Sequence, residues 1–205
     1  MGRLRLGVLI SGSGTNLQAI IDACKEGRLD AEVRVVISNH DTAFGLERAR
    51  RSGIRDVYID RSRYDRPKAY NAAILQALRD NDVDTVVMAG YMRLLGTSVL
   101  EAYPHRVLNI HPALLPSFAG ANGIHDAFDY GVKVTGVTVH FADEEFDRGP
   151  ILAQEPVRIE EDDTIESLEA KIHAIEHLLY PQALQWLAEG RVQIEGRKVR
   201  ILPAS

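Results

Sequence analysis

The chain has the length and composition expected of one soluble globular domain, with 205 residues of which 45% are hydrophobic and 26% charged. Its net charge of −5 lacks the basic footprint of nucleic-acid-binding proteins, so we expect no nucleic-acid partner. No apolar run reaches transmembrane length, and the single cysteine, Cys24, excludes a disulfide within the chain. We therefore expect a cytoplasmic protein with no membrane partner.

The first half of the chain alternates between apolar runs typical of buried strands and segments with helical spacing. This alternation predicts the α/β class, with a mostly parallel Rossmann-like sheet and helices on both faces. Strands are predicted at Leu4–Ser11, Val33–Ser38, Val57–Ile59, Thr85–Ala89 and Val107–Ile110, and helices at Leu17–Glu26, Phe44–Ser52, Arg66–Asn81 and Leu94–Tyr103.

The pattern changes in the second half of the chain. Two longer β-rich segments, Val132–Phe141 and Ile151–Ile159, flank an acidic loop and predict antiparallel additions to the sheet. A capping-box-like Asp163-Thr-Ile-Glu166 begins a long helix that we expect to bend at Pro181. The tail, Val192–Leu202, predicts a hairpin at the edge. Because we find no linker or repeat, we expect residues 1–205 to form a single domain.

A glycine-containing turn, Ser11-Gly-Ser-Gly-Thr-Asn16, joins the first strand to the first helix. Glycines allow a tight turn, and the helix N-terminus offers unpaired N–H groups to an anion. The dinucleotide fingerprint would need a third glycine where Leu17 stands, so a single phosphate fits better. A plain strand-to-helix turn is the alternative. The phosphate ligands that we expect are Gly14, Thr15 and Asn16.

A carboxamide and an imidazole alternate at the end of a buried strand. Asn109 and His111 project from the same side, and Pro112 ends the strand, where ligands bind in open α/β sheets. A later loop that ends in Gly-Pro contributes Asp147. Together an amide, an imidazole and a carboxylate can polarise a carbonyl and move a proton. We predict Asn109, His111 and Asp147 as the catalytic group and interpret His140 as structural.

The motif Asn109-Ile-His-Pro-Ala-Leu-Leu-Pro116, followed by Asp147-Arg-Gly-Pro150, resembles the formyltransferases that use 10-formyltetrahydrofolate. The branch that formylates glycinamide ribonucleotide fits essentially the whole chain, because the tRNA-modifying and hydrolase branches carry additional domains. The resemblance implies direct attack of the amino group of glycinamide ribonucleotide on the formyl carbon, in purine biosynthesis. A formyltetrahydrofolate hydrolase and a non-catalytic nucleotide-binding module are the alternatives. We expect a monomer or a homodimer.

The resemblance also implies roles for individual residues. Asn109 would donate to the formyl oxygen, His111 would support the oxyanion and act as general acid, and Asp147 would orient the imidazole and take up the amine proton. The glycine turn would bind the phosphate, and Glu176 the ribose hydroxyls. An apolar slot with a polar edge would hold the folate, and its expected residues are Met92, Arg93, Leu94, Leu95, Asn109, Asp143 and Glu144.

One segment of the last long helix matches a zinc motif. His173-Ala-Ile-Glu176-His177 has the His-x-x-Glu-His pattern, and its two histidines face the same side of a helix. A zinc site also needs a distant acidic ligand, and few residues follow His177. We therefore expect no metal and assign Glu176 to the nucleotide.

Two positions depart from the family pattern. Ala119 stands before Gly120 where the family usually has proline, which predicts a looser turn without loss of a functional group. Pro67 replaces a basic residue that contacts folate, and either Arg66 or Lys68 could take its place.

Overall fold

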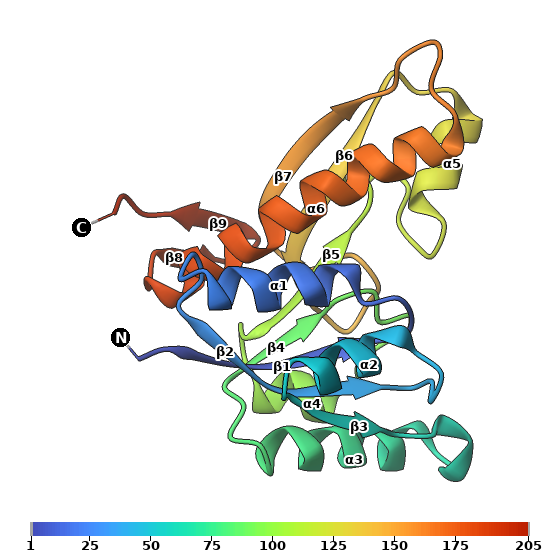
Figure 1. The fold of residues 1–205 in the computed structure, drawn as a ribbon. Coiled ribbons are helices and arrows are strands. Elements are labelled where there is room, and N and C mark those ends of the chain that lie inside the picture. The colour runs from blue at the N-terminus through green and yellow to red at the C-terminus, as the bar shows by residue number, and fades with distance from the viewer. Residues whose placement is uncertain (1, 205) are drawn as a thin grey trace.

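A seven-stranded sheet forms the centre of the computed structural model, which describes residues 2–204 (Figure 1). The strand order is β3-β2-β1-β4-β5-β6-β7, in which β1 to β5 are parallel and β6 and β7 are antiparallel additions. The predicted fold class is thereby confirmed. The strands span Leu4–Ile10 (β1), Ala31–Ser38 (β2), Arg55–Tyr58 (β3), Thr85–Met88 (β4), Val107–His111 (β5), Val134–Phe141 (β6) and Ile151–Arg158 (β7).

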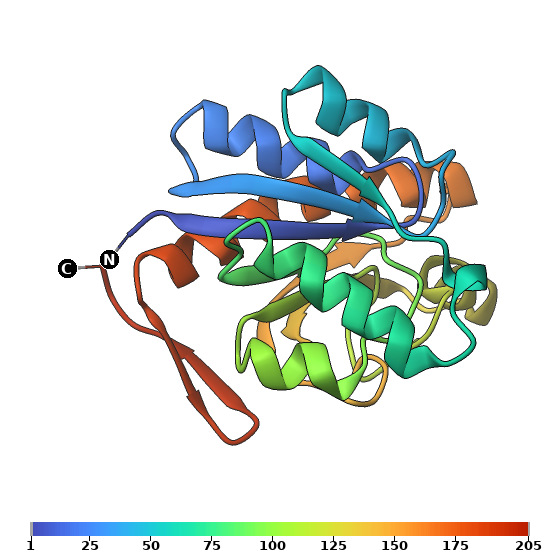
Figure 2. The same cartoon turned by 90° about the horizontal axis from the view of Figure 1, so that it is seen from below.

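Helices cover both faces of the sheet, as the alternating pattern predicted (Figure 2). Apolar residues of α1, α2 and α6 belong to one buried cluster, and those of α3 and α4 to a second cluster on the opposite face. The larger cluster also includes inward-facing residues of β6 and β7. The helices span Thr15–Lys25 (α1), Phe44–Arg51 (α2), Pro67–Arg79 (α3), Thr97–Ala102 (α4), Gly123–Tyr130 (α5) and Ile165–Ala188 (α6).

Some element boundaries differ from the sequence predictions for local reasons. The helix predicted from Leu94 begins only at Thr97, because the backbone N–H of Gly96 donates to the side chain of Asn71 at 2.7 Å. The capping box of α6 uses Thr164 and Ser167, one residue later than predicted. The sequence did not predict α5, which is short and lies in a glycine-rich segment, or the 3-10 turn at residues 61–63.

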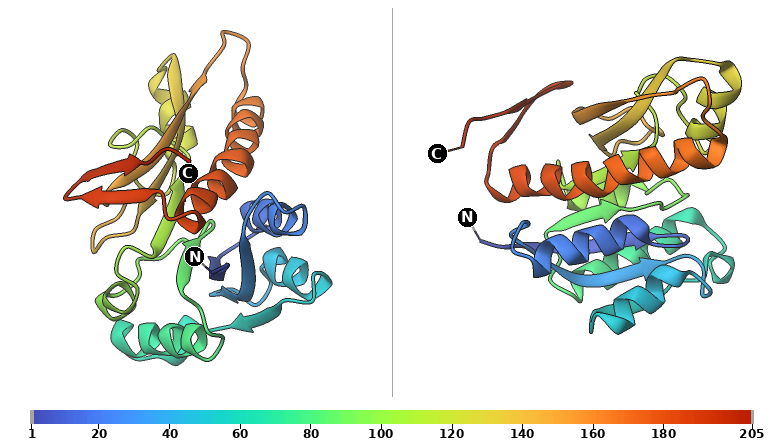
Figure 3. Two further views of the ribbon diagram at one scale, coloured as in Figure 1. Left: turned by 90° about the vertical axis from the view of Figure 1, so that its left-hand side faces the viewer. Right: turned by 45° about the horizontal axis from the view of Figure 1, so that its top comes forward.

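The C-terminal hairpin forms as predicted, but as a separate two-stranded sheet and not as part of the seven-stranded one. Strand β8 spans Val192–Glu195 and β9 spans Lys198–Ile201. In Figure 3 the hairpin is the red pair of strands, and β9 contacts β7 of the main sheet. Its inner face is apolar, because Val192, Ile194 and Val199 pack against the larger core cluster.

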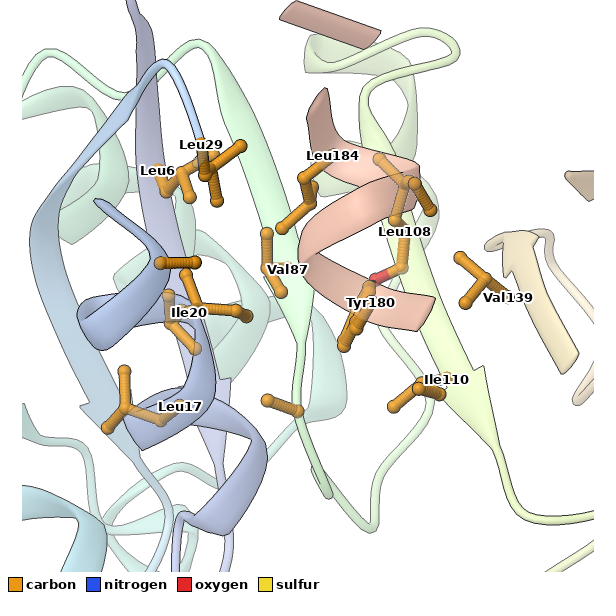
Figure 4. Packing of buried hydrophobic residues seen from close by; sticks show 14 of the residues in the cluster. Leu6, Leu17, Ile20, Leu29, Val87, Leu108, Ile110, Val139, Tyr180 and Leu184 are labelled. Atoms are coloured by element: carbon orange, nitrogen blue, oxygen red, sulfur yellow. The ribbon is translucent and has the colours of Figure 1, made fainter. Parts of the chain in front are cut away.

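One buried tyrosine of α6 links this helix to two central strands. The hydroxyl of Tyr180 lies 3.0 Å from the carbonyl oxygen of Met88 on β4 and 2.9 Å from that of Leu108 on β5. Figure 4 shows Tyr180 beside Leu108 in the core. Burial raises the pKa of Tyr180 well above its ordinary value, so the hydroxyl keeps its proton. The contact fixes α6 against the last residue of β4 and the second residue of β5.

We expect Tyr180→Phe to lower the free energy of unfolding by about 1–3 kcal/mol, because it removes a buried hydrogen-bond donor that faces two carbonyl groups. Urea denaturation followed by circular dichroism measures this change. Tyr130→Phe is the matched control, because Tyr130 is exposed and its substitution should change stability by less than about 0.5 kcal/mol. Equal effects of the two substitutions would contradict the role assigned to Tyr180.

Candidate active site

The ends of β5 and β6 bring most of the predicted catalytic residues to one place. Asn109 and His111 alternate along β5 and pair in register with His140 and Thr138 of the antiparallel strand β6. Asp147 comes from the loop that connects β6 to β7. The neighbouring strand therefore delivers a second imidazole, His140, beside the predicted group.

The carboxylate of Asp147 lies between two imidazoles. Its Oδ2 is 3.5 Å from Nδ1 of His111, and its Oδ1 is 3.6 Å from Nε2 of His140. The Nε2 of His140 is also 3.2 Å from the amide nitrogen of Asn109. These four side chains form one contiguous group, in which the two imidazoles and the carboxylate are almost completely buried.

His140 is part of this group, although sequence reasoning interpreted it as structural. Its Nδ1 lies 2.9 Å from the carbonyl oxygen of Phe141, and a carbonyl can only accept, so Nδ1 carries a proton. Its Nε2 faces both the amide nitrogen of Asn109, at 3.2 Å, and Oδ1 of Asp147, at 3.6 Å. The arrangement orients the Asn109 carboxamide. His140 joins this group because it lies opposite Asn109 in the pairing of β5 with β6. The sequence does not reveal the register of that pairing, so it gave no signal for His140.

Asp147 is ionised and has a constrained backbone. Burial raises the pKa of its carboxyl, but a hydrogen bond from His140, the backbone N–H of Gly120 and the charge of His111 together lower the pKa below its ordinary value. Its φ of 55° lies in the left-handed region, which a residue other than glycine rarely adopts. Such a conformation persists only when surrounding contacts hold it.

The loop at residues 117–121 covers the histidine and the carboxylate. Nε2 of His111 donates to the carbonyl oxygen of Phe118 at 2.8 Å, and the N–H of Gly120 donates to Asp147 at 2.8 Å. Both nitrogens of His111 therefore face acceptors, which a doubly protonated ring satisfies. Sequence reasoning treated this loop only as a turn loosened by Ala119 and missed its backbone contacts, because such contacts depend on conformation and not on side-chain type.

A cavity of about 520 Å³ contains all of the residues predicted to bind the nucleotide. Gly14, with φ of 70°, precedes α1, and a Cβ at this position would lie 2.7 Å from the Cα of Gly45. Only glycine fits this turn, whose following backbone N–H groups belong to the free first turn of α1. The cavity is lined by Gly14, Thr15, Asn16 and Glu176, together with His40, His125 and His173.

Sequence reasoning missed two histidines of this cavity. His40 follows β2 at the carboxyl edge of the sheet, a position that could have signalled its role. His125 belongs to α5, the helix that was not predicted.

A buried link joins the glycine turn to α6. The amide nitrogen of Asn16 donates to Oε2 of Glu176 at 2.9 Å, across 160 positions of the chain. Nδ1 of His173 lies 3.0 Å from the same oxygen. The hydrogen bond to Glu176 raises the pKa of His173, whereas burial lowers that of His177. Asn16 and His173 thus hold the carboxylate of Glu176 at the lining of the cavity.

The zinc-like motif does not form a metal cluster in the described part of the chain. The rings of His173 and His177 are stacked 6.3 Å apart, and Glu176 is engaged by Asn16 and His173. Across residues 2–204, no group of three or more histidine, cysteine, aspartate or glutamate side chains is arranged to hold a metal ion.

A second, smaller cavity of about 20 Å³ lies beside the catalytic group. Four of the residues predicted to bind folate line it: Leu94, Leu95, Asn109 and Asp143. Sequence reasoning missed Phe146, which also lines this cavity although its side chain is 56% exposed. An isolated aromatic residue in an acidic loop gives no signal of its own.

The remaining predicted folate residues lie elsewhere. Met92 lines the larger cavity, because its N–H donates at 3.0 Å to the hydroxyl of Ser11 beside the glycine turn. Arg93 and Glu144 are exposed and line neither cavity.

The sequence profile of the formyl transferase family matches residues 4–184. The chain belongs to this family. It is 40% identical over 183 residues to a phosphoribosylglycinamide formyltransferase of Bacillus subtilis, covering 89% of this chain and 94% of that protein. It is 41% identical to the phosphoribosylglycinamide formyltransferase of Escherichia coli, covering 91% and 88% of the two chains.

Solved structures extend the comparison. Glycinamide ribonucleotide transformylase 1 from Symbiobacterium toebii superimposes with a TM-score of 0.96 at 51% identity, covering 99% of this chain and 96% of that one. A formyltetrahydrofolate deformylase from Pseudomonas syringae is more distant, with a TM-score of 0.89 at 29% identity. It covers 98% of this chain but only 66% of the deformylase. None of the helices in the described residues is long and apolar enough to span a membrane.

The charge of His173 should make nucleotide binding depend on pH. Because its pKa is raised, the positive form persists above the ordinary titration range of histidine and attracts a phosphate in the same cavity. We expect KM for glycinamide ribonucleotide to rise as pH increases through this pKa. His173→Gln should remove that part of the pH dependence in initial-rate measurements.

His105→Asn provides the matched control, because the ring of His105 packs against Phe141 and lines neither cavity. An unchanged pH dependence of KM in His173→Gln would show that His173 does not contribute charge to nucleotide binding.

Proposed function

We propose that this enzyme transfers the formyl group of 10-formyltetrahydrofolate to the amino group of glycinamide ribonucleotide. The observation that carries this proposal is that neighbouring residues of the same strand line two different cavities. On β5, Asn109 lines the small cavity and Ile110 lines the large one. At the end of the neighbouring strand β4, Met88 lines the small cavity and Ala89 lines the large one. Two substrates bound on either side would therefore meet at the catalytic group. The names of the matched relatives support transfer of a formyl group to the same nucleotide.

The larger cavity suits a phosphorylated ribose. Its glycine turn offers the N–H groups of a helix N-terminus to a phosphate. Glu176, buried and held by Asn16 and His173, is an acceptor for ribose hydroxyl groups. With the phosphate and ribose bound in this way, the glycinamide amine extends toward the end of β5.

The smaller cavity is the proposed site of the folate. Leu94, Leu95 and Phe146 supply apolar surface, and Asp143 supplies a polar edge. Its volume of about 20 Å³ is too small for a pteridine, so folate binding requires the exposed loop at residues 143–146 to move outward. Arg93, Glu144 and Met92 would contact folate only after such a movement.

The chemistry requires one proton to leave the amine and one to reach N10 of the folate. Attack of the amine on the formyl carbon gives a tetrahedral intermediate, whose oxyanion the amide of Asn109 and the protonated ring of His111 stabilise. Asp147, ionised at neutral pH, takes up the amine proton directly or through water. His111 donates its proton to N10 as the carbon–nitrogen bond breaks, with N10 replacing the carbonyl oxygen of Phe118 as the acceptor of the Nε2–H. These steps yield formylated nucleotide and tetrahydrofolate.

One assay separates this proposal from its alternatives. The purified protein is incubated with 10-formyltetrahydrofolate, with and without glycinamide ribonucleotide, and the formation of tetrahydrofolate is followed by absorbance. We expect turnover only when the nucleotide is present, with one formylated nucleotide formed for each folate consumed. Turnover without nucleotide would identify a hydrolase. Binding of both compounds without turnover would identify a non-catalytic module.

We expect Asp147→Asn to lower kcat by about a hundredfold or more, because the carboxamide cannot accept the amine proton or balance an imidazolium. Binding of folate, measured by fluorescence quenching, should change little. Asp129→Asn is the control, because Asp129 is an exposed carboxylate of α5 outside both cavities. Retention of near-normal kcat in Asp147→Asn would remove this residue from the mechanism.

A further inference from the structure

The C-terminal hairpin lies outside the segment that the family profile matches. The profile ends at residue 184, whereas β8 and β9 span residues 192–201. The base of the hairpin is closed by two hydrogen bonds between Arg191 and Leu202, one of them from the backbone N–H of Leu202 at 2.8 Å. With its apolar face on the core and its base closed, the hairpin has a defined position on the body of the enzyme.

The tip of the hairpin contacts the loop that carries Asp147. Gly196, with φ of 60°, and Arg197 form the two-residue turn between β8 and β9. Nη1 of Arg197 donates to the backbone carbonyl oxygen of Arg148 at 2.7 Å. Arg148 directly follows Asp147 in the chain. A residue outside the family segment therefore reaches the backbone of the residue that follows the proposed catalytic Asp147.

The backbone around Asp147 needs support because it is strained. The left-handed φ of Asp147 is unfavourable for a residue with a side chain. On its C-terminal side, Gly149 leaves no space for a Cβ against the carbonyl of Phe141, and the N–H of Phe141 donates to the carbonyl of Pro150 at 2.9 Å. The peptide after Arg148 connects this anchored segment to Asp147, and Arg197 holds its carbonyl oxygen.

We propose that Arg197 is a positioning residue for Asp147 and that the hairpin braces the base of the catalytic loop. The guanidinium acts through the backbone of Arg148 and touches neither cavity lining. It fixes the end of the loop, whereas the exposed residues 143–146 stay free to move for folate. Because this role rests on the proposed function, its tests include a measurement that is independent of activity.

Steady-state kinetics of three variants test whether Arg197 positions Asp147. Arg197→Ala should lower kcat roughly three- to tenfold, the size expected when one hydrogen bond is lost, with KM for glycinamide ribonucleotide unchanged. Arg197→Lys keeps a cationic donor and should recover most of the lost kcat. Arg200→Ala removes a neighbouring guanidinium that faces Glu195 of the hairpin and should behave like the wild type.

Hydrogen exchange followed by mass spectrometry provides the independent readout. We expect faster exchange at residues 142–149 in Arg197→Ala, with exchange of the hairpin at 192–202 unchanged. A variant in which only the hairpin exchanges faster would mean that Arg197 stabilises the hairpin alone, which overturns the proposal. Wild-type kcat together with wild-type exchange of the loop would overturn it as well.

These outcomes are distinct from a failure of the proposed function. If the wild-type enzyme does not formylate the nucleotide, kcat of the variants cannot be compared. The amide hydrogen exchange of residues 142–149 then decides by itself whether Arg197 holds the loop.

Discussion

The candidate active site depends on the interaction of the buried Asp147 carboxylate with two histidines. The carboxylate contacts His111 of β5, His140 of β6 and the backbone of Gly120, and so joins two strands and a covering loop. Two histidines and an N–H group offset the unfavourable burial of its charge, which explains why its pKa is lowered inside the protein. The strained backbone is tolerated at this position because it directs the carboxylate between the two rings.

The parallel half of the sheet and its antiparallel extension contribute different parts of the site. The carboxyl ends of β1, β2 and β4 supply the glycine turn, His40 and the floor of the large cavity. The antiparallel strand β6 supplies His140 and leads into the loop of Asp147. β5 lies at the boundary between the two halves, and its consecutive residues divide between two cavities. A transfer between two bound molecules is a reaction that such an arrangement favours.

The long helix α6 connects the nucleotide site to the core. Tyr180 links it to backbone carbonyl groups of β4 and β5, and one turn earlier Glu176 accepts a hydrogen bond from Asn16 of α1. Changes that loosen α6 should therefore affect nucleotide binding as well as stability. The C-terminal hairpin, which follows α6 directly, extends this dependence to the catalytic loop through Arg197.

The sequence alone determined the α/β class and predicted the glycine turn, because periodicity and turn composition are local properties of the chain. The resemblance to the formyltransferases added Asn109, His111, Asp147 and Glu176 as candidate site residues. Only the tertiary structure decided that His140 lies beside the proposed catalytic residues, because strand register is set by packing across the sheet. Met92 faces the large cavity for a similar reason, since a hydrogen bond to Ser11, 81 positions away, fixes its backbone. Contacts between distant segments, such as Arg197 with Arg148, leave no periodic signal in either segment and are decided by the fold.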